Sequence, residues 1–235
     1  MERQDTGKRL NKYIADSGYC SRREADRLIG EGRVRVDGRT GGLGDRVLPG
    51  SVVEVDGHSL TGDGEKVYLL LNKPRGIVCT ADPREPMNVV DYVNHPARIF
   101  PVGRLDKDSE GLLLLTSDGA IVNRVLRAAG GHEKEYEVTI DRPVTPEFVR
   151  SMMAGVPILD TVTLPCRVRK TGERSFNIIL VQGLNRQIRR MCEALGANVV
   201  HLRRVRIMNL KLGSLRPGEW RELTEAELQG LKAQL

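Results

Sequence analysis

The sequence predicts an α+β fold in two domains, and three observations lead to that expectation. Short apolar runs bounded by turn residues indicate many strands, and segments of helical period lie between them without regular alternation. This pattern favours a mostly antiparallel mixed sheet flanked by helices. A stretch rich in Gly, Asp and Ser over residues 57–66 is typical of a linker, so we place a small domain at 7–63 and a large domain at 64–235.

The small domain begins with two predicted helices. Leu10 and Ile14 fall at helical spacing, and Ser21 with Glu24 forms the S-x-x-E pattern of a capping box. The second helix should bury three apolar side chains, those of Ala25, Leu28 and Ile29. Residues 33–36 then alternate at strand period and lead into Asp37-Gly38, a hairpin turn signal, and residues 52–55 should return as a strand.

In the large domain, predicted strands and helices follow one another without regular alternation. Strands are predicted at 67–71, 112–115, 134–140, 162–169, 176–181, 199–208, 211–212 and 218–222. Helices are predicted near 89–93, 120–129, 145–154 and 185–195, with a last one after a second capping pattern, Thr224 to Glu227. Short turns rich in Gly, Pro and charge connect them.

One stretch stands apart, GRLDKDSEGLLLLTSDG from Gly103 to Gly119. Its apolar run, residues 112–115, is typical of a buried strand, and five charged side chains precede it within seven residues, from Arg104 to Glu110. Loops held by a rigid scaffold often carry catalytic side chains. A solvated turn would show the same spacing, so both interpretations stay open at this point.

The charge pattern is compatible with a nucleic-acid partner. The chain has a net charge of +6, and residues 186–206 hold six arginines against one acid. Residues 8–35 hold eight basic residues against four acids. Arginine suits phosphate recognition better than lysine because its guanidinium is a planar fork. An ordinary solvated helix face is the alternative in each case.

Other classes of protein are not indicated. No apolar stretch approaches the length of a membrane span, and the N-terminus has no apolar signal region, so we expect a cytoplasmic protein without a membrane partner. The four cysteines show no C-x-x-C spacing, and the four histidines are dispersed. We therefore expect no metal site, and a monomer.

Residues 7–55 resemble a known RNA-binding module. The R-L-x-K-x-I start, the S-R-R-E-A centre and the G-x-V-x-V-D-G end are similar to the S-four-like domain, also called the alpha-L motif. The resemblance implies that basic residues of this domain bind the phosphates of structured RNA. The residues so implicated are Lys12, Arg22 and Arg23.

The large domain resembles the pseudouridine synthases that modify ribosomal RNA, the RsuA family. Its G-R-L-D motif lies at 103–106, an L-N-K-P-x-G turn at 71–76, an H-E-K-E-Y strand at 132–136 and G-L-N-R-Q-I-R-R-M at 183–191. In detail, these motifs are closest to the F-type branch that acts on the large ribosomal subunit. The order of several motifs is more specific than any one of them.

The resemblance implies an activity and a site. Such enzymes detach a uracil from its ribose, turn it and rejoin it through ring carbon 5, with no cofactor, after flipping the nucleotide out of its stack. Asp106 would be the nucleophile, attacking either the ribose or the ring, Arg189 its counter-charge and Tyr136 the ring that stacks on the uracil. The RNA would further contact residues beside these: Arg104, Leu105, Lys107, Arg186, Gln187, Ile188 and Arg190.

Three alternatives accompany this hypothesis. The substrate could be small-subunit ribosomal RNA, and the same motifs would also suit a ribosome-assembly protein that binds RNA without catalysis. A glycosidase would need a second carboxylate beside Asp106, from Asp108 or Glu110. A transfer RNA remains open as a further substrate. Individually, Tyr136 could be a core aromatic, and Arg186 or Arg190 a solvated side chain.

Overall fold

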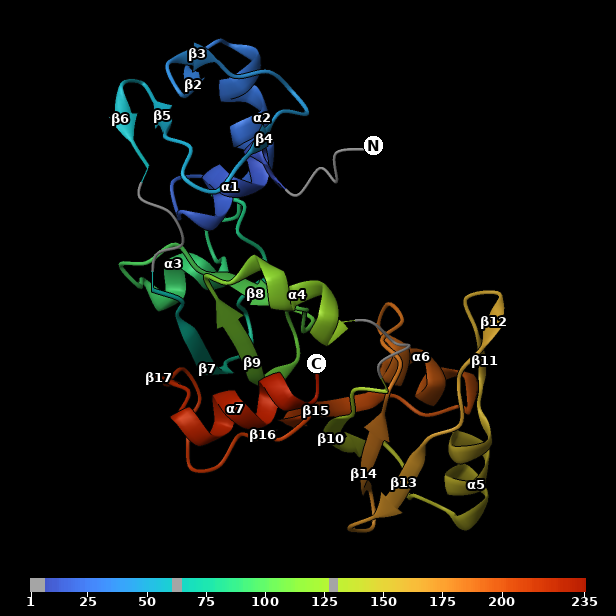
Figure 1. Ribbon diagram of the computed structural model, residues 1–235. Helices are drawn as coiled ribbons and strands as arrows, with labels where there is room; N and C mark the ends of the chain where they lie inside the picture. The colour runs from blue at the N-terminus through green and yellow to red at the C-terminus, as the bar shows by residue number, and fades with distance from the viewer. Residues whose placement is uncertain (1–6, 61–64, 127–130) are drawn as a thin grey trace. The chain divides into compact units, whose positions relative to one another are not determined.

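The structure is a computed structural model that describes residues 7–60, 65–126 and 131–235 (Figure 1). Within these ranges the chain forms two units. The N-terminal unit contains residues up to 67 together with 96–99 and 117–119, and the large unit contains the remainder. No helix of the described ranges is long and apolar enough to cross a membrane.

Two helices pack on a small sheet in the N-terminal unit. Helices α1 (Leu10–Asp16) and α2 (Arg22–Gly30) bury the expected face of Ala25, Leu28 and Ile29. The hydroxyl of Ser21 accepts a hydrogen bond from the Glu24 amide, as predicted. The second half of the capping box is absent among the described contacts, because the Glu24 carboxylate binds Arg27 instead.

Strands complete the core of this unit. The four-stranded sheet has the order β3-β2-β5-β6, from Arg39–Thr40, Val34–Val36, Val53–Val55 and His58–Ser59, and β1 (Lys8–Arg9) pairs separately with β4 (Arg46–Val47). The Asp37-Gly38 turn has positive φ at both residues, the geometry of a tight hairpin. Strand β6 occupies part of the predicted linker, and residues 61–64 of that linker lie outside the described ranges.

The large unit is built on a nine-stranded sheet. Seven strands follow the order β13-β14-β10-β15-β9-β7-β17, and β8 and β16 pair with β9 and β15 at its side. Their bounds are β7 Tyr68–Lys73, β8 Phe100–Val102, β9 Glu110–Thr116, β10 Lys134–Ile140, β13 Arg167–Lys170, β14 Ser175–Leu180, β15 Val199–Ile207, β16 Leu210–Lys211 and β17 Trp220–Glu222. Among these described strands every pair is antiparallel except β9 with β15. The predicted α+β class is therefore confirmed.

Five helices cover this sheet. They are α3 Val89–Val93, α4 Gly119–Leu126, α5 Pro146–Ala154, α6 Gln187–Ala194 and α7 Glu225–Ala233. Helix α5 begins beside the Thr145 cap and ends at Gly155, and α7 has the complete capping box of Thr224 and Glu227, both as predicted. The predicted continuation of α4 to residue 129 falls on residues 127–130, which lie outside the described ranges.

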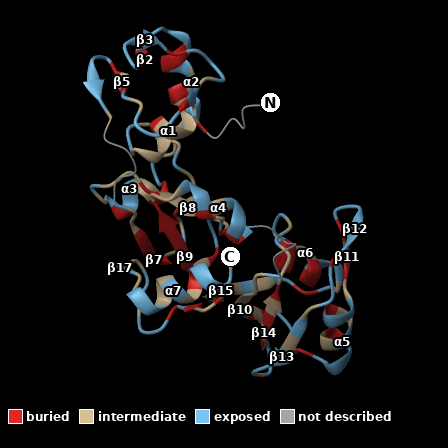
Figure 2. Cartoon of the chain, in the orientation of Figure 1, coloured by how far each residue is buried: buried red, intermediate tan, exposed pale blue. Residues whose placement is uncertain are grey.

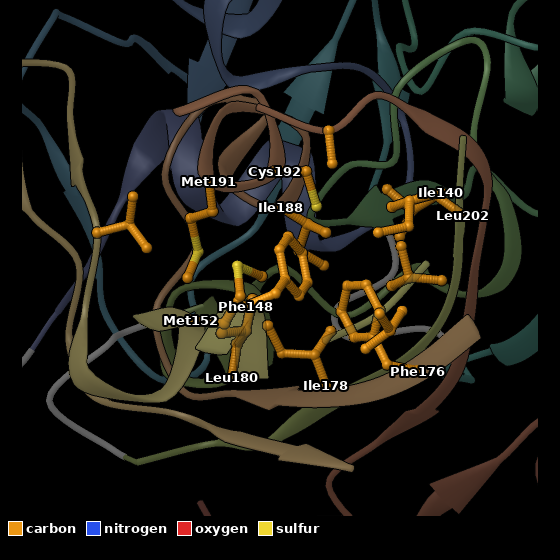
Figure 3. Close-up of a cluster of buried hydrophobic side chains, with 14 of the residues drawn as sticks. Ile140, Phe148, Met152, Phe176, Ile178, Leu180, Ile188, Met191, Cys192 and Leu202 are labelled. Atoms are coloured by element: carbon orange, nitrogen blue, oxygen red, sulfur yellow. The ribbon is translucent and has the colours of Figure 1, made fainter. Parts of the chain in front are cut away.

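Two apolar clusters hold the sheet. Strand β7 is buried along its length and β9 from Gly111 onward, and the four leucines 112–115 have no exposed surface (Figure 2). Burying one such side chain contributes about 1.5–3 kcal/mol. The second cluster lies among β10, β14, α5 and α6, where Phe148 and Phe176 meet edge to face at 5.5 Å (Figure 3). Three buried residues of the second cluster, Leu180, Ile188 and Leu202, also line a pocket of the large unit.

One predicted strand differs from the structure. Instead of a single strand over 162–169, the chain forms a hairpin of β11 (Pro157–Ile158) and β12 (Thr161–Val162), and β13 begins only at Arg167. Pro165 has no amide hydrogen for a ladder, and the Leu164 amide is bonded to the side chain of Gln182. The segment between the two strands is therefore not part of the sheet.

Candidate active site

The loop Arg104–Ser109 enters the buried strand β9 and is held by its neighbours. The Leu105 amide donates to Sγ of Cys79 at 3.3 Å, and the Lys107 carbonyl accepts from the Gly76 amide at 2.8 Å. The loop also closes on itself, since the Ser109 amide donates to the Asp106 carbonyl. Leu105 and Ser109 are buried, whereas the Asp106 side chain keeps 30% of its surface exposed.

Three buried cations bind the loop and its strand through oxygen atoms. Lys73, with no exposed surface, donates to the carbonyls of Ser109 and Pro74 at 2.8 Å each. Arg189 donates to Oγ of Ser109 and to the Asp108 carbonyl at 3.1 and 3.3 Å. Arg204 donates to the Leu112 carbonyl at 2.7 Å. Burial lowers the pKa of Lys73, because a desolvated ammonium is disfavoured, although the neighbouring acids partly oppose this effect.

The Asp106 carboxylate meets two guanidinium groups. Its Oδ2 lies 3.6 Å from Nε of Arg189 and 3.6 Å from Nη1 of Arg186, so both contacts are ion pairs longer than hydrogen bonds. Nε of Arg189 is buried and has no hydrogen-bond partner among the described residues. Arg186 has a left-handed backbone, φ 49°, at the residue before α6. The side chain of Arg186 is 41% exposed and that of Arg189 10%.

Tyr136 lies on β10, which is separated by β15 from β9, the strand that follows this loop. It occupies the middle of β10, opposite Ile178 of β14 and Arg204 of β15, and is half-buried. The guanidinium carbon of Arg204 lies 6.0 Å from the centre of its ring, within the range of a cation–π contact.

Asp106 and Tyr136 line one pocket of about 90 Å³, open to solvent. The other residues at its wall come from the same loop, the end of β14, the start of α6 and β15, namely Arg104, Leu105, Ser109, Leu180, Gln182, Gly183, Leu184, Arg186, Gln187, Ile188 and Leu202. Arg189 lies behind the pocket and reaches it through its ion pair with Asp106. The structure therefore brings together the three side chains implicated by the sequence.

The two acids that follow Asp106, Asp108 of the loop and Glu110 of β9, lie outside the pocket. Oε1 of Glu110 accepts a hydrogen bond from Nε2 of His201 at 2.9 Å, and its Oε2 lies 3.7 Å from Nε of Arg75. Asp108 is exposed, and neither carboxylate lines the pocket. A glycosidase arrangement needs two carboxylates at one cavity. Among the described residues, Asp106 is the only one with a carboxylate that lines this pocket.

The remaining predicted RNA-contacting residues fall in three settings. Arg104 and Lys107 are exposed, and Arg190 is bonded to Asn185 on the surface. Leu105, Gln187 and Ile188 are largely buried and present only part of their surface at the pocket. Gln187 accepts from the Leu184 amide, which closes the turn before α6. In the N-terminal unit Arg22 and Arg23 are exposed and Lys12 is half-buried.

Sequence reasoning missed several residues of this site. Lys73, Cys79, Gln182 and Arg204 support or line it, and none was singled out. Lys73 lies in the L-N-K-P turn, and Arg204 in the arginine-rich segment, but neither pattern showed which side chain turns inward. No group of three metal-ligating side chains occurs within the described ranges.

Comparisons with known proteins agree with the two-unit architecture. Residues 67–194 match the family described as RNA pseudouridylate synthase, and residues 8–53 match the S4 domain. The chain is 56% identical to "Dual-specificity RNA pseudouridine synthase RluF" of Salmonella typhi over 226 residues, 95% of this chain and 78% of that protein. It is 37% identical to "Ribosomal large subunit pseudouridine synthase B" of Bacillus subtilis, covering 96% of both.

A solved structure extends the similarity to the fold. A crystal structure of a pseudouridylate synthase superposes with a TM-score of 0.70 and 30% sequence identity, over 95% of this chain and 99% of that one. The similarity thus spans both units and the whole of the candidate site.

Proposed function

The chain belongs to the RNA pseudouridylate synthase family and is an RNA pseudouridine synthase, and from this premise we propose that it isomerises a uridine of 23S ribosomal RNA with Asp106 as nucleophile. The observation that carries the proposal is that Asp106, paired with Arg189, lines the same pocket as Tyr136. Relatives named for the large ribosomal subunit and for dual specificity support the choice of substrate.

The reaction needs a nucleophile that later leaves. The bond from uracil N1 to ribose C1′ breaks, a bond from C5 to C1′ forms, the C5 proton departs and N1 gains a proton, so the atoms balance without a cofactor. The Asp106 carboxylate would form a transient covalent bond, to the ribose or to the ring, that divides the rearrangement into easier steps. Arg189 and Arg186 would orient this carboxylate and balance its charge.

Tyr136 would hold the uracil during the rearrangement. Stacking of one base on an aromatic ring is worth on the order of 1–3 kcal/mol. Extruding a nucleotide from its stack costs a few kcal/mol. The Tyr136 ring, which lines the pocket, would offset part of that cost.

The N-terminal unit would contribute affinity. We assign residues 7–63 to an S-four-like RNA-binding domain and 64–235 to the catalytic domain. Within the described chain, Arg22 and Arg23 make no ion pair, whereas Arg27 of the same helix is paired with Glu24 and Glu31. The unpaired guanidinium groups are the ones available to phosphates. We further propose that the protein acts as a monomer in the cytoplasm.

Pseudouridine mapping tests this function. Ribosomal RNA from cells with and without the gene is treated with carbodiimide, and primer-extension stops are compared along both ribosomal RNAs and the transfer RNAs. We expect one stop in 23S RNA that disappears with the gene and returns with the wild-type copy. A gene-dependent stop only in the small subunit would overturn the substrate assignment, and release of free uracil by the purified protein would favour hydrolysis.

A further inference from the structure

Arg204 is a buried guanidinium without a counter-charge. Only 3% of the residue is exposed, and no carboxylate of the described chain lies within 4.0 Å of its nitrogens. An arginine stays protonated at any physiological pH, and burial of an unpaired charge is costly. Its Nη2 has no hydrogen-bond partner among the described residues. A core that needed only packing would place an apolar side chain here.

The contacts of Arg204 reach both the loop that carries Asp106 and the ring of Tyr136. Nε donates to the Leu112 carbonyl at 2.7 Å, and Nη1 reaches the Arg104 carbonyl at 3.5 Å, two residues before Asp106. On the other side its guanidinium carbon lies 6.0 Å from the centre of the Tyr136 ring. One planar group therefore binds the loop that carries the carboxylate and lies within cation–π range of the Tyr136 ring.

The position of Arg204 in the sheet explains this reach. Its backbone lies between Tyr136 of β10 and Gly111 of β9. The pairing of β9 with β15 covers only Glu110 and Gly111, so the next carbonyl, that of Leu112, is taken by the Arg204 side chain. The guanidinium thus supplies a hydrogen bond to β9 at the point where backbone pairing with β15 stops.

We propose that Arg204 is a positioning residue for the isomerisation, holding the loop of Asp106 and the ring of Tyr136 at one separation. It does not line the pocket and is not expected to touch the uracil. The proposal rests on the functions proposed above for Asp106 and Tyr136. A misplacement of one ångström between reacting groups can cost about a hundredfold in rate, so a residue behind the site can control the chemical step.

Arg204→Lys tests the role of the planar group, and Arg204→Gln tests the same contacts without the charge. Lysine keeps the charge but has no planar guanidinium, so it cannot place separate nitrogens where Nε and Nη1 of Arg204 meet the Leu112 and Arg104 carbonyls. We expect the single-turnover rate on a 23S RNA fragment to fall at least tenfold in each variant, per folded molecule, with the RNA Kd within twofold of wild type. Arg206→Lys is the matched control, since Arg206 of the same strand is paired with Glu133 and Glu135; its rate should stay within twofold.

A spectroscopic measurement separates positioning from general support of the fold. With 3-fluorotyrosine incorporated and the Tyr136 resonance assigned from Tyr136→Phe, we expect that resonance to shift or broaden in Arg204→Lys and to stay unchanged in Arg206→Lys. A folded Arg204 variant with the wild-type rate or an unchanged Tyr136 resonance would overturn the proposal. An inactive wild-type protein would instead count against the proposed function, so the two failures are distinguishable.

Discussion

Nε of Arg189 lies 3.6 Å from Oδ2 of Asp106, although the two residues come from a loop and a helix far apart in the sequence. The other nitrogens of Arg189 bind the Asp108 carbonyl, the Ser109 hydroxyl and the Val199 carbonyl. The guanidinium is thereby fixed in direction before it meets the carboxylate. A point charge on a flexible chain could not make the same set of contacts.

Arg189→Lys should therefore lower the chemical rate without preventing folding. We expect a loss of about tenfold to a hundredfold in the single-turnover rate, which corresponds to about 1.4–2.8 kcal/mol of activation free energy. Arg190→Lys is the control for the chemical rate at saturating RNA: it keeps the charge predicted to contact RNA, and the Arg190 side chain binds Asn185 and not Asp106 among the described residues. Equal rates for the two variants would contradict the assigned role of Arg189.

Replacing Arg22 and Arg23 by glutamine should weaken RNA binding in a salt-dependent manner. If each arginine neutralises one phosphate, the slope of log K against log salt should become shallower by about 1.4–1.8 in the double variant. Filter binding over a range of salt concentrations measures this slope. Arg27→Gln should leave the slope nearly unchanged, since Arg27 is already occupied by Glu24 and Glu31; an equal effect would contradict the distinction.

Gly111→Ala should destabilise the large unit. Gly111 has φ +106°, and an added Cβ would lie 2.3 Å from the Arg204 carbonyl oxygen, where the strands β9 and β15 approach. Backbone strain and this overlap together should cost about 3 kcal/mol of unfolding free energy. Gly183→Ala is the matched control, because nothing lies within 4 Å of its Cβ position. Urea denaturation of both variants measures the difference.

Glu227 should make stability depend on acid pH. The Arg221 side chain, and secondarily the amide and hydroxyl of Thr224, lower the pKa of Glu227 to about 2 from its ordinary 4.5. The folded state therefore binds this proton less readily than the unfolded state, so the stabilisation is present above pH 4.5 and is lost as the pH falls toward 2. After allowance for solvent screening at this partly exposed pair, its contribution is about 1 kcal/mol.

The check for Glu227 is the difference in unfolding free energy between wild type and Glu227→Gln. That difference should be largest near neutral pH and shrink below pH 4.5. Glu225→Gln, in the same helical turn but bonded only to Gln229 among the described residues, should show no comparable dependence. A constant Glu227 difference over this range would show that the ion pair does not stabilise α7.

Much of the architecture was predictable because apolar runs and helix-capping residues are patterns within short segments of the chain. The run Leu112–Leu115 is the buried core of β9, and the cap residues Thr145 and Thr224 start their helices where the pattern indicated. The hairpin of β11 and β12 was missed because its strands have two residues each, too few for a period to be detected. Its turn, Leu159-Asp160, also has positive φ without any glycine.

For the candidate site, the sequence predicted which side chains come together, but it did not predict the residues that support them. Asp106, Tyr136 and Arg189 belong to motifs that could be identified along the chain. Lys73 and Arg204 depend on which way a strand residue points and on which carbonyls the neighbouring strands leave free. Those facts arise from the register of β7, β9 and β15, which no single segment contains.

The central claim is that the Asp106 carboxylate performs the isomerisation. Asp106→Asn and the control Asp108→Asn are compared on 23S RNA fragments labelled with tritium at C5 of uridine, since formation of the new carbon–carbon bond releases that hydrogen to water. We expect Asp106→Asn to bind the RNA and release no tritium above background, while Asp108→Asn, whose side chain lies outside the pocket, works within about threefold of wild type. Release of tritium by Asp106→Asn at the wild-type rate would contradict the account.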